Sequence, residues 1–258
     1  MSEQLSRAIS SNQEGPHSDV PGLVARYWQN PFRKPIAEHS AAAFAEAASI
    51  VDTFHGPIIL DACCGVGEST ATLARRYPEA LVIGVDKSAH RLGKHTAHSS
   101  SADVGRYVLV RADLNDFWRL AADAQWQPTH QFLMYPNPWP KKKHLGRRWH
   151  GSPVFPSMVK LGGNFELRSN WSVYLQEMSL ALAALSVDSA MEQLPDDLAP
   201  ITPFERKYQA SGQALWRLQA HLEHPQLVEP SQLDELRKLA EATADMLKSS
   251  ARKNEARR

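Results

Sequence analysis

Short apolar runs alternate with segments of helical spacing through most of this chain. Five runs rich in Ile, Leu, Val and Phe have the length of buried strands, and segments with apolar residues every three or four positions lie between them. The predicted strands span residues 57–60, 81–85, 107–110, 132–135 and 164–167. Strands that alternate with helices form βαβ units with parallel strands. The pattern therefore predicts an α/β fold with a mainly parallel, doubly wound sheet.

The segments around these strands complete the predicted fold. Residues 39–54 predict a helix ahead of the first strand, and Asn170 stands where a cap is expected before a strongly apolar helix. Residues 214–222 predict an antiparallel strand at the edge of the sheet, whereas the Pro-rich stretch 194–203 predicts irregular structure.

Three regions differ in composition. Residues 1–35 predict a mobile, polar N-terminal arm followed by an aromatic strap that packs over the domain or covers a ligand. Residues 36–222 hold the alternating pattern and predict one α/β domain. Residues 223–258 predict a helical extension with a basic tail.

Charge and cysteine usage narrow the class of protein. The 258 residues carry a formal net charge of +1 at pH 7, and no apolar run approaches the ~18 residues that would span a bilayer. Cys63 and Cys64 are adjacent, so they form no disulfide framework, which indicates a reducing compartment. The first residues have no cationic start followed by an apolar core, so no signal peptide is expected. These features predict a cytoplasmic protein without membrane contacts.

Carboxylates and glycines mark a cofactor site at the ends of the first three strands. Gly65 and Gly67 follow the first strand, where glycine lets the backbone approach a ligand at a helix N-terminus. Asp86 ends the second strand, placed for two ribose hydroxyls, and Asp113 follows the third, placed for an adenine amino group. Asp61 could serve the amino-acid end of a sulfonium cofactor. Three acids and no lysine in the loop favour S-adenosylmethionine over NAD or ATP.

A rigid corner followed by cations marks a second site after the fourth strand. Asn137 lies between Pro136 and Pro138, which fix the backbone on either side. No Asp or Glu occurs between Asp123 and Glu166, so the cations there favour phosphate binding over a solvated loop. His144 is either a phosphate or substrate ligand or a surface residue. The cations are Lys141, Lys142, Lys143, Arg147 and Arg148.

No metal site is expected. His90, His95 and His98 have a spacing that metal ligands can have, but they lie on a polar segment without a matching set of Cys or acidic residues. A solvated helix face is the simpler interpretation.

Three motifs resemble those of the bacterial tRNA guanine-N7-methyltransferase family. They are Pro136-Asn137-Pro138-Trp139-Pro140-Lys141 with His144, Arg147 and Arg148; Ser169-Asn170-Trp171; and residues 202–208 with Gly212 and Trp216. The similarity spans residues 57–218, and the chain is identified as a diverged member. It implies a Rossmann-like class I methyltransferase fold, S-adenosylmethionine as cofactor, tRNA as partner and 7-methylguanine as product.

The resemblance also assigns roles to individual residues. Asn137, Asn170 and Glu205 would surround the acceptor base as catalytic residues, and Thr202 and Glu205 would bind the substrate. Four further residues, Lys141, His144, Arg147 and Arg148, would contact phosphates.

Amides replace two carboxylates of the family, at Asn137 and Asn170, and Cys63 replaces a glycine. Guanine N7 has a free lone pair, so methyl transfer to it needs positioning rather than a base. An amide accepts a hydrogen bond without a charge, a loss of about 1 kcal/mol. Two alternatives therefore stay open: an N-methyltransferase for a small purine-like heterocycle, and an RNA-binding protein whose catalytic acids have decayed. Retention of Asp86, Asp113 and Glu205 argues against decay.

Overall fold

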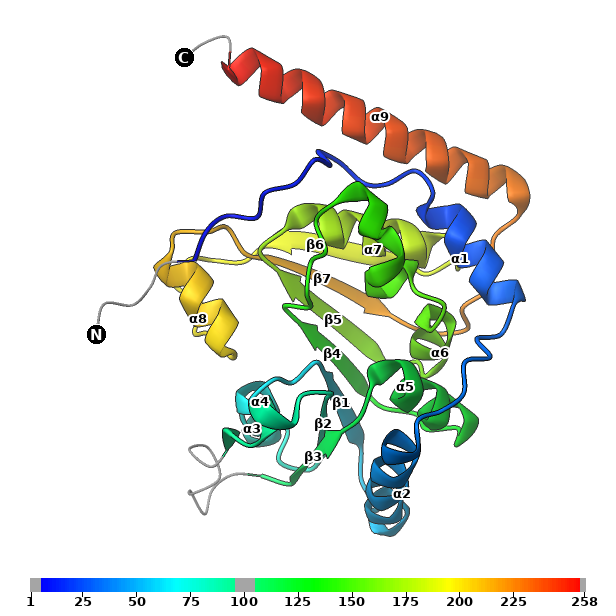
Figure 1. Ribbon diagram of the computed structural model, residues 1–258, viewed down its shortest axis with the longest axis vertical. Coiled ribbons are helices and arrows are strands. Elements are labelled where there is room, and N and C mark those ends of the chain that lie inside the picture. Colours follow the sequence, from blue (N-terminus) through cyan, green and yellow to red (C-terminus); the bar gives the residue numbers. More distant parts are fainter. Residues whose placement is uncertain (1–5, 96–104, 256–258) are drawn as a thin grey trace.

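The computed structural model describes residues 6–95 and 105–255, the last six of them by backbone alone. Its centre is a seven-stranded sheet of order β3-β2-β1-β4-β5-β7-β6 (Figure 1). Strands β1 to β5 pair in parallel, and β7 pairs antiparallel with both β5 and β6. This confirms the predicted α/β fold. The strands are β1 (Ile58–Ala62), β2 (Leu81–Asp86), β3 (Tyr107–Arg111), β4 (His130–Met134), β5 (Asn164–Ser169), β6 (Ser189–Gln193) and β7 (Trp216–His221).

The sheet edge next to β7 differs from the sequence prediction. The strand predicted at residues 214–222 exists as β7, but it lies inside the sheet, and β6 forms the edge. The sequence of β6 contains one large apolar residue, Met191, and most of its side chains are exposed or half-buried. Because β6 is stabilised by its pairing with β7 rather than by burial, its sequence lacks the apolar pattern from which a strand is predicted.

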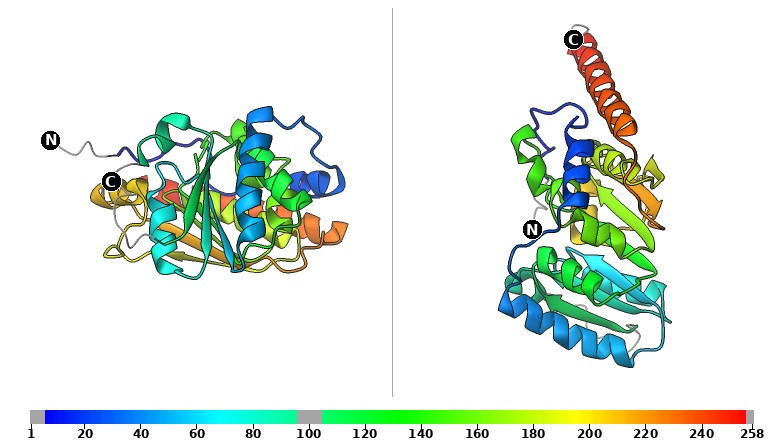
Figure 2. Two further views of the ribbon diagram at one scale, coloured as in Figure 1. Left: turned by 90° about the horizontal axis from the view of Figure 1, so that it is seen from below. Right: turned by 90° about the vertical axis from the view of Figure 1, so that its right-hand side faces the viewer.

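Helices lie on both sides of the part of the sheet that contains β1, β2 and β3 (Figure 2). On one face α3 buries Leu73 and Ala74 against Ile59 and Val82 of the sheet. On the other face α2, α5, α6 and α7 share the larger apolar core, which includes Phe44 and Phe117. These helices are α2 (Glu38–Thr53), α3 (Glu68–Arg76), α4 (Ala89–Leu92), α5 (Leu114–Asp123), α6 (Phe155–Lys160) and α7 (Ser172–Ala183).

The half of the sheet formed by β5, β7 and β6 is covered on one face. Along β5 the apolar side chains Phe165 and Leu167 alternate with the polar residues Asn164, Glu166 and Arg168, of which only Asn164 is exposed. Helix α7 packs against the apolar face. On the opposite face Asn164, Gln219 and Glu192 are exposed. The doubly wound arrangement is therefore incomplete in this half of the sheet.

Two further helices were not predicted. The strap region contains α1 (Val20–Gln29), which packs on α6 and α7. The sequence did not predict α1 because Pro21 and Gly22, which are usually found in turns, lie at its start, although proline suits the first turn of a helix. Helix α8 (Pro203–Ala210) begins after Thr202, whose side chain caps it. The predicted cap at Asn170 is wrong, because α7 begins at Ser172 and the Asn170 amide instead donates to Gln213.

The segments at both ends of the chain contact the domain. Before α1, the described part of the predicted arm hydrogen-bonds with the domain, for example from Ser6 N to Ser211 Oγ at 2.8 Å. After β7, α9 (Pro230–Glu255) packs against α1 and α7. The division into arm, domain and extension stays a prediction, and the side chains of most of the basic tail lie outside the described residues. In the described ranges no helix combines the length and hydrophobicity needed to cross a membrane.

Candidate active site

The loop between β1 and α3 has an unusual backbone. Cys63, Gly65 and Gly67 all have positive φ, at 62°, 62° and 79°. Glycine adopts this conformation freely, whereas an L side chain such as that of Cys63 is strained there. A Cβ atom on Gly67 would lie 2.6 Å from Nδ1 of His95, so the loop passes close under that ring. The loop therefore presents tightly turned backbone at the carboxyl end of β1.

Asp61, inside β1, is a buried acid with a free oxygen. Its Oδ2 accepts from Ser69 Oγ at 2.7 Å and from Thr70 Oγ1 at 2.6 Å, while its buried Oδ1 has no hydrogen-bond partner. Burial raises the pKa of Asp61 to about 6, against the lowering effect of the two hydroxyl groups. A buried acceptor without a donor fits a cationic or donor group of a bound molecule.

Asp86 and Asp113 occupy the predicted positions at the ends of β2 and β3. Asp86 is buried, accepts from Gly65 N at 3.1 Å, and pairs through Oδ1 with Arg91 at 2.8 Å. Asp113 Oδ1 accepts from Asn115 N at 2.9 Å, which caps α5. A ribose that bound Asp86 Oδ1 would replace Arg91, whose side chain is 43% exposed and free to swing outward. These carboxylate acceptors suit the ribose hydroxyls and amino group of a nucleoside cofactor.

The predicted acceptor residues lie on three segments that meet at Glu205. The Glu205 carboxylate is fully buried and accepts from Tyr135 at 3.1 Å and from Arg168 at 2.7 Å. Tyr135 precedes Asn137 by two positions in the sequence, and Arg168 precedes Asn170 by two positions. Glu205 Oε2 also accepts from Ile201 N at 2.8 Å. Its oxygens are therefore engaged by the protein, and in this structure Glu205 joins the segments around the acceptor site rather than facing it.

The Thr202 side chain, like that of Glu205, is engaged in a hydrogen bond within the protein. Its Oγ1 accepts from Glu205 N at 2.9 Å and so caps α8. Asn170 Nδ2 donates to Gln213 Oε1 at 2.8 Å, whereas Asn137 is exposed, with one long contact of 3.4 Å from Trp139 N to its Oδ1. Of the predicted acceptor residues, Asn137 is the most available to a ligand.

Helix α8 connects the segments predicted to bind the acceptor to the loop between β1 and α3. Arg206 of α8 forms an ion pair with Glu68, the first residue of α3 and the neighbour of Gly67. The helix also carries Phe204, whose side chain is 47% exposed. The two predicted sites therefore share one end of the sheet, where β1, β2, β4 and β5 reach their carboxyl ends, as expected for ligands of open α/β sheets.

The basic residues after the corner form a 3₁₀ turn, η2 (Lys142–Arg147). The three lysines and Arg147 are exposed. The Arg147 guanidinium lies 4.7 Å from the centre of the Trp139 ring, and the His144 ring meets the same tryptophan edge-on. His144 is half-buried with an unpartnered Nδ1; burial and the nearby cations lower its pKa. These groups remain candidates for phosphate contacts.

Arg148 is the exception in this cationic run. Its side chain is fully buried and donates from Nη1 to both oxygens of Glu177, at 2.6 and 2.5 Å. It also donates to the carbonyl oxygens of Trp139 and Lys141, at 3.1 and 3.3 Å, and stacks 4.9 Å from the Trp171 ring. The predicted phosphate contact of Arg148 disagrees with this position, because no surface atom remains for a phosphate. Arg148 supports the corner from inside.

Several residues around the site were not identified from the sequence. Glu177, Arg168 and His150 are charged or polar groups on buried elements, and Gln13 belongs to the arm. A signal existed for Glu177, which interrupts the apolar face of the predicted helix between Tyr174 and Met178. An acid at such a position indicates a buried partner, because an unpaired charge there would be too costly.

His95 does not lie on a solvated face as predicted. Its ring contacts Val66 O at 2.9 Å and Tyr107 Oη at 2.6 Å, over the glycine loop. His98 lies outside the described residues. Within the described ranges no group of three or more His, Cys, Asp or Glu residues is arranged for a metal ion.

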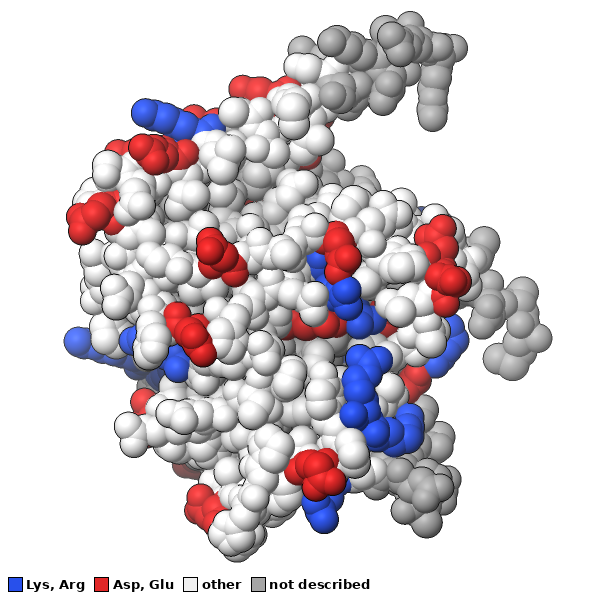
Figure 3. All heavy atoms as spheres, turned by 180° about the vertical axis from the view of Figure 1, so that it is seen from behind, with Lys and Arg blue, Asp and Glu red and all other residues white. Residues whose placement is uncertain are grey.

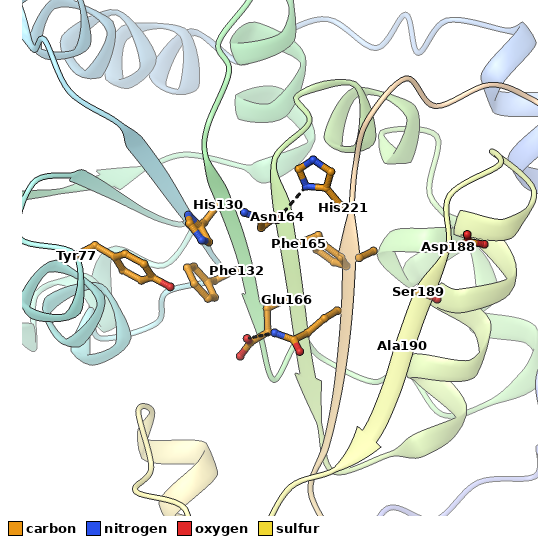
Figure 4. Close-up of a pocket in the computed structure, with 12 residues that line it drawn as sticks. Tyr77, His130, Phe132, Asn164, Phe165, Glu166, Asp188, Ser189, Ala190 and His221 are labelled. Atoms are coloured by element: carbon orange, nitrogen blue, oxygen red, sulfur yellow. Dashed lines mark hydrogen bonds between the residues drawn. The ribbon is translucent and has the colours of Figure 1, made fainter.

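A cavity of about 620 Å³ on the solvated face of the sheet is distinct from this site (Figure 4). His130 and Asn164 in its lining begin β4 and β5, so it lies at the amino ends of these strands. Figure 4 shows hydrogen bonds between its own residues, from Gln219 to Glu166 at 3.3 Å and between His221 and Asn164 at 2.9 Å. The face drawn in Figure 3 carries both acidic and basic groups.

Known proteins resemble the chain over this same region. Residues 55–218 match a family of putative methyltransferases. A tRNA (guanine-N(7)-)-methyltransferase of Neisseria meningitidis serogroup A is 30% identical over 175 residues, which cover 63% of this chain and 70% of the relative.

Two solved structures share the fold. An antibiotic-related methyltransferase superposes with a TM-score of 0.53 at 13% identity, covering 69% of this chain and 94% of its own. A variant 16S rRNA (adenine(1408)-N(1))-methyltransferase with cosubstrate SAM, from Catenulisporales acidiphilia, superposes with a TM-score of 0.50 at 20% identity, covering 72% and 92%.

Proposed function

Because the chain belongs to the family of putative methyltransferases that includes the tRNA guanine-N7-methyltransferases, we propose that it forms 7-methylguanine in tRNA with S-adenosylmethionine as methyl donor. One observation carries the proposal. Helix α8 ties the segments of Asn137 and Asn170 to the start of α3 through Glu205 and Arg206, so acceptor and cofactor residues share one end of the sheet.

The cofactor residues fit S-adenosylmethionine. When bound, it supplies a methyl group on a positively charged sulfur. The free Oδ1 of Asp61 would accept from its ammonium group, directly or through water, and Asp86 would accept from the ribose hydroxyls. Asp113 would lie near the adenine, and Gly65 and Gly67 leave room for the chain of the cofactor.

The protein's role in the transfer is positioning. Because guanine N7 has a free lone pair, no side chain would have to remove a proton from it before it accepts the methyl group. The Asn137 oxygen can accept from the guanine edge, and its exposed position at a stiff corner keeps it available. Lys141, His144 and Arg147 would hold phosphates nearby. A cytoplasmic location belongs to the same proposal, since tRNA is the substrate.

A second candidate keeps the chemistry but changes the acceptor. Asn137 and Asn170 stand where the family has carboxylates, which favours a neutral, small purine-like heterocycle. The exposed cations of η2 favour RNA instead, because a small neutral ligand gives them no partner.

Mass spectrometry of nucleosides separates these candidates. Purified protein is incubated with bulk unmodified tRNA and S-adenosylmethionine carrying a labelled methyl group. Labelled 7-methylguanosine is expected. Cofactor binding without any label in tRNA would overturn the tRNA assignment and leave the small heterocycle.

A further inference from the structure

The segment that precedes α1 runs beside residues 140–147, which we call the basic turn, and encloses a cavity with them. This cavity, of about 790 Å³, is lined by Ser10, Ser11, Asn12 and His17 on one side and by Lys141, Lys142 and Lys143 on the other. We call residues 10–17 the docked segment. In the part of the chain that the structure describes, none of the three lysines pairs with a carboxylate.

Two hydrogen bonds between side chains of the docked segment and backbone atoms of the turn connect the two walls of the cavity. Ser11 Oγ donates to Pro140 O at 2.6 Å, and Lys142 N donates to Asn12 Oδ1 at 3.1 Å. Both bonds use main-chain atoms of the turn, so the lysine ammonium groups stay available. The cavity therefore combines three free cations with hydroxyl, amide and imidazole groups, which is the donor set that binds phosphate oxygens.

Gln13 anchors the docked segment to the same buried group that holds Arg148. Its Nε2 donates to Glu177 Oε1 at 2.6 Å, and its Oε1 accepts from Arg148 Nη2 at 3.0 Å. His17 N also donates to Glu177 Oε1, at 3.0 Å. Arg148 in turn holds the carbonyl oxygens of Trp139 and Lys141. The position of the segment and the conformation of the corner are thus set by one network.

Helix α9 holds the docked segment from its outer side. A Cβ atom on Gly15 would lie 2.6 Å from Cα of Ala244, so the two backbones pass in direct contact. The segment is enclosed between α7, through Glu177, and α9, through Ala244. Any side chain at position 15 would push it away from α9.

We propose that the docked segment and the lysines of the basic turn form a composite site for the RNA phosphate backbone, and that Gln13 is a positioning residue that assembles it. The inference rests on the proposed tRNA substrate. It gives the N-terminal segment, which lies outside the region matched to the family, a part in RNA binding.

The test measures tRNA binding by the full chain against salt concentration. Gln13→Ala removes the anchor, Gly15→Ala separates the segment from α9, and Lys142→Gln with Lys143→Gln removes the cations. Gln193→Ala makes the same chemical change as Gln13→Ala at an exposed position of β6. Calorimetric titration with S-adenosylmethionine checks that each variant keeps its cofactor site.

Each of the three site variants should weaken tRNA binding by about threefold or more and make the slope of log K against log salt shallower by about one to two. Gln13→Ala added to the lysine changes should cause no further loss, because both act on one site. The control should match the wild type, and all variants should bind the cofactor equally.

Two failures are distinguishable. If the wild type forms no 7-methylguanosine and binds tRNA without salt dependence, the proposed function fails. If the wild type methylates tRNA but both Gln13→Ala and Gly15→Ala keep its affinity and salt slope, or if their losses simply add to those of the lysine changes, the composite site is wrong.

Discussion

Arg148 and Glu177 form a fully buried ion pair, with Nη1 of the arginine 2.5 Å from Oε2 of the glutamate. The pair lies under the corner that carries Asn137, and the adjacent Arg147 points outward over Trp139. Two neighbouring arginines of one basic motif therefore differ in task. One supports the site from inside, and the other stays free for a ligand.

This difference gives the first prediction. Arg148→Ala leaves the Glu177 charge buried without its cation, so the free energy of unfolding should fall by about 3–5 kcal/mol. Arg147→Ala removes an exposed group and should cost about 0.5–1 kcal/mol of stability while weakening tRNA binding. Urea unfolding and tRNA titration measure the two effects. Equal stability losses for the two variants would contradict the buried role of Arg148.

Acid should weaken the fold through Glu177. Burial by itself would raise the pKa of this carboxyl, but hydrogen bonding from His150 and the charge of Arg148 bring it to about 2, below the usual 4.5. The native state therefore holds the proton less tightly than the unfolded chain, and the stability contributed by Glu177 is lost as the pH falls from about 4.5 to about 2. Calorimetric scans of the wild type over this range should show a steeper loss of Tm than scans of Glu177→Gln. Parallel curves would contradict the assignment.

Cofactor affinity should depend on pH through Asp61. Burial raises the pKa of this carboxyl from 3.8 to about 6, and a cofactor ammonium group would favour the ionised form. Below about pH 6 the carboxyl must lose a proton on binding, so Kd should rise about tenfold for each pH unit. Titration calorimetry between pH 5 and pH 7.5 tests this. Asp61→Asn should bind more weakly and without this pH dependence, whereas a pH-dependent variant would assign the effect to another group.

Asp86 should be required for the cofactor. Asp86→Ala removes the predicted acceptor for the ribose and also the contact to Gly65 N that supports the glycine loop. No binding of S-adenosylmethionine is expected in calorimetry. Asp123→Ala, the same change at the end of α5, serves as control and should bind normally. Unchanged affinity of Asp86→Ala would overturn the assignment of this loop.

Restoring one carboxylate should improve catalysis on tRNA. Asn137→Asp would offer a charged acceptor at the exposed corner, worth about 1 kcal/mol or roughly fivefold in kcat/KM. Initial rates with labelled cofactor and tRNA measure the effect. Asn164→Asp makes the same change at the amino end of β5 and should leave the rate unchanged. A lower rate for Asn137→Asp would show that the amide itself suits the acceptor.

The sequence determined the parts of this protein that depend on local pattern. Buried strands are marked by apolar runs, and Asp86 and Asp113 stand at or soon after the ends of two such runs, so the α/β fold and the places of these two acids could be predicted. Strand β6 could not, because pairing with β7 rather than burial holds it. Helix α1 was hidden by Pro21 and Gly22 in its first turn.

Which charged groups face the solvent and which are buried depends on contacts between distant parts of the chain. Arg147 and Arg148 are alike in sequence, but Glu177 on α7 and Gln13 near the N-terminus draw one of them inside. Glu205 likewise pairs with Arg168 rather than facing the acceptor. These partners are separated by 29, 135 and 37 positions along the chain, and the free energy of a buried charge depends on the partner that the fold brings to it.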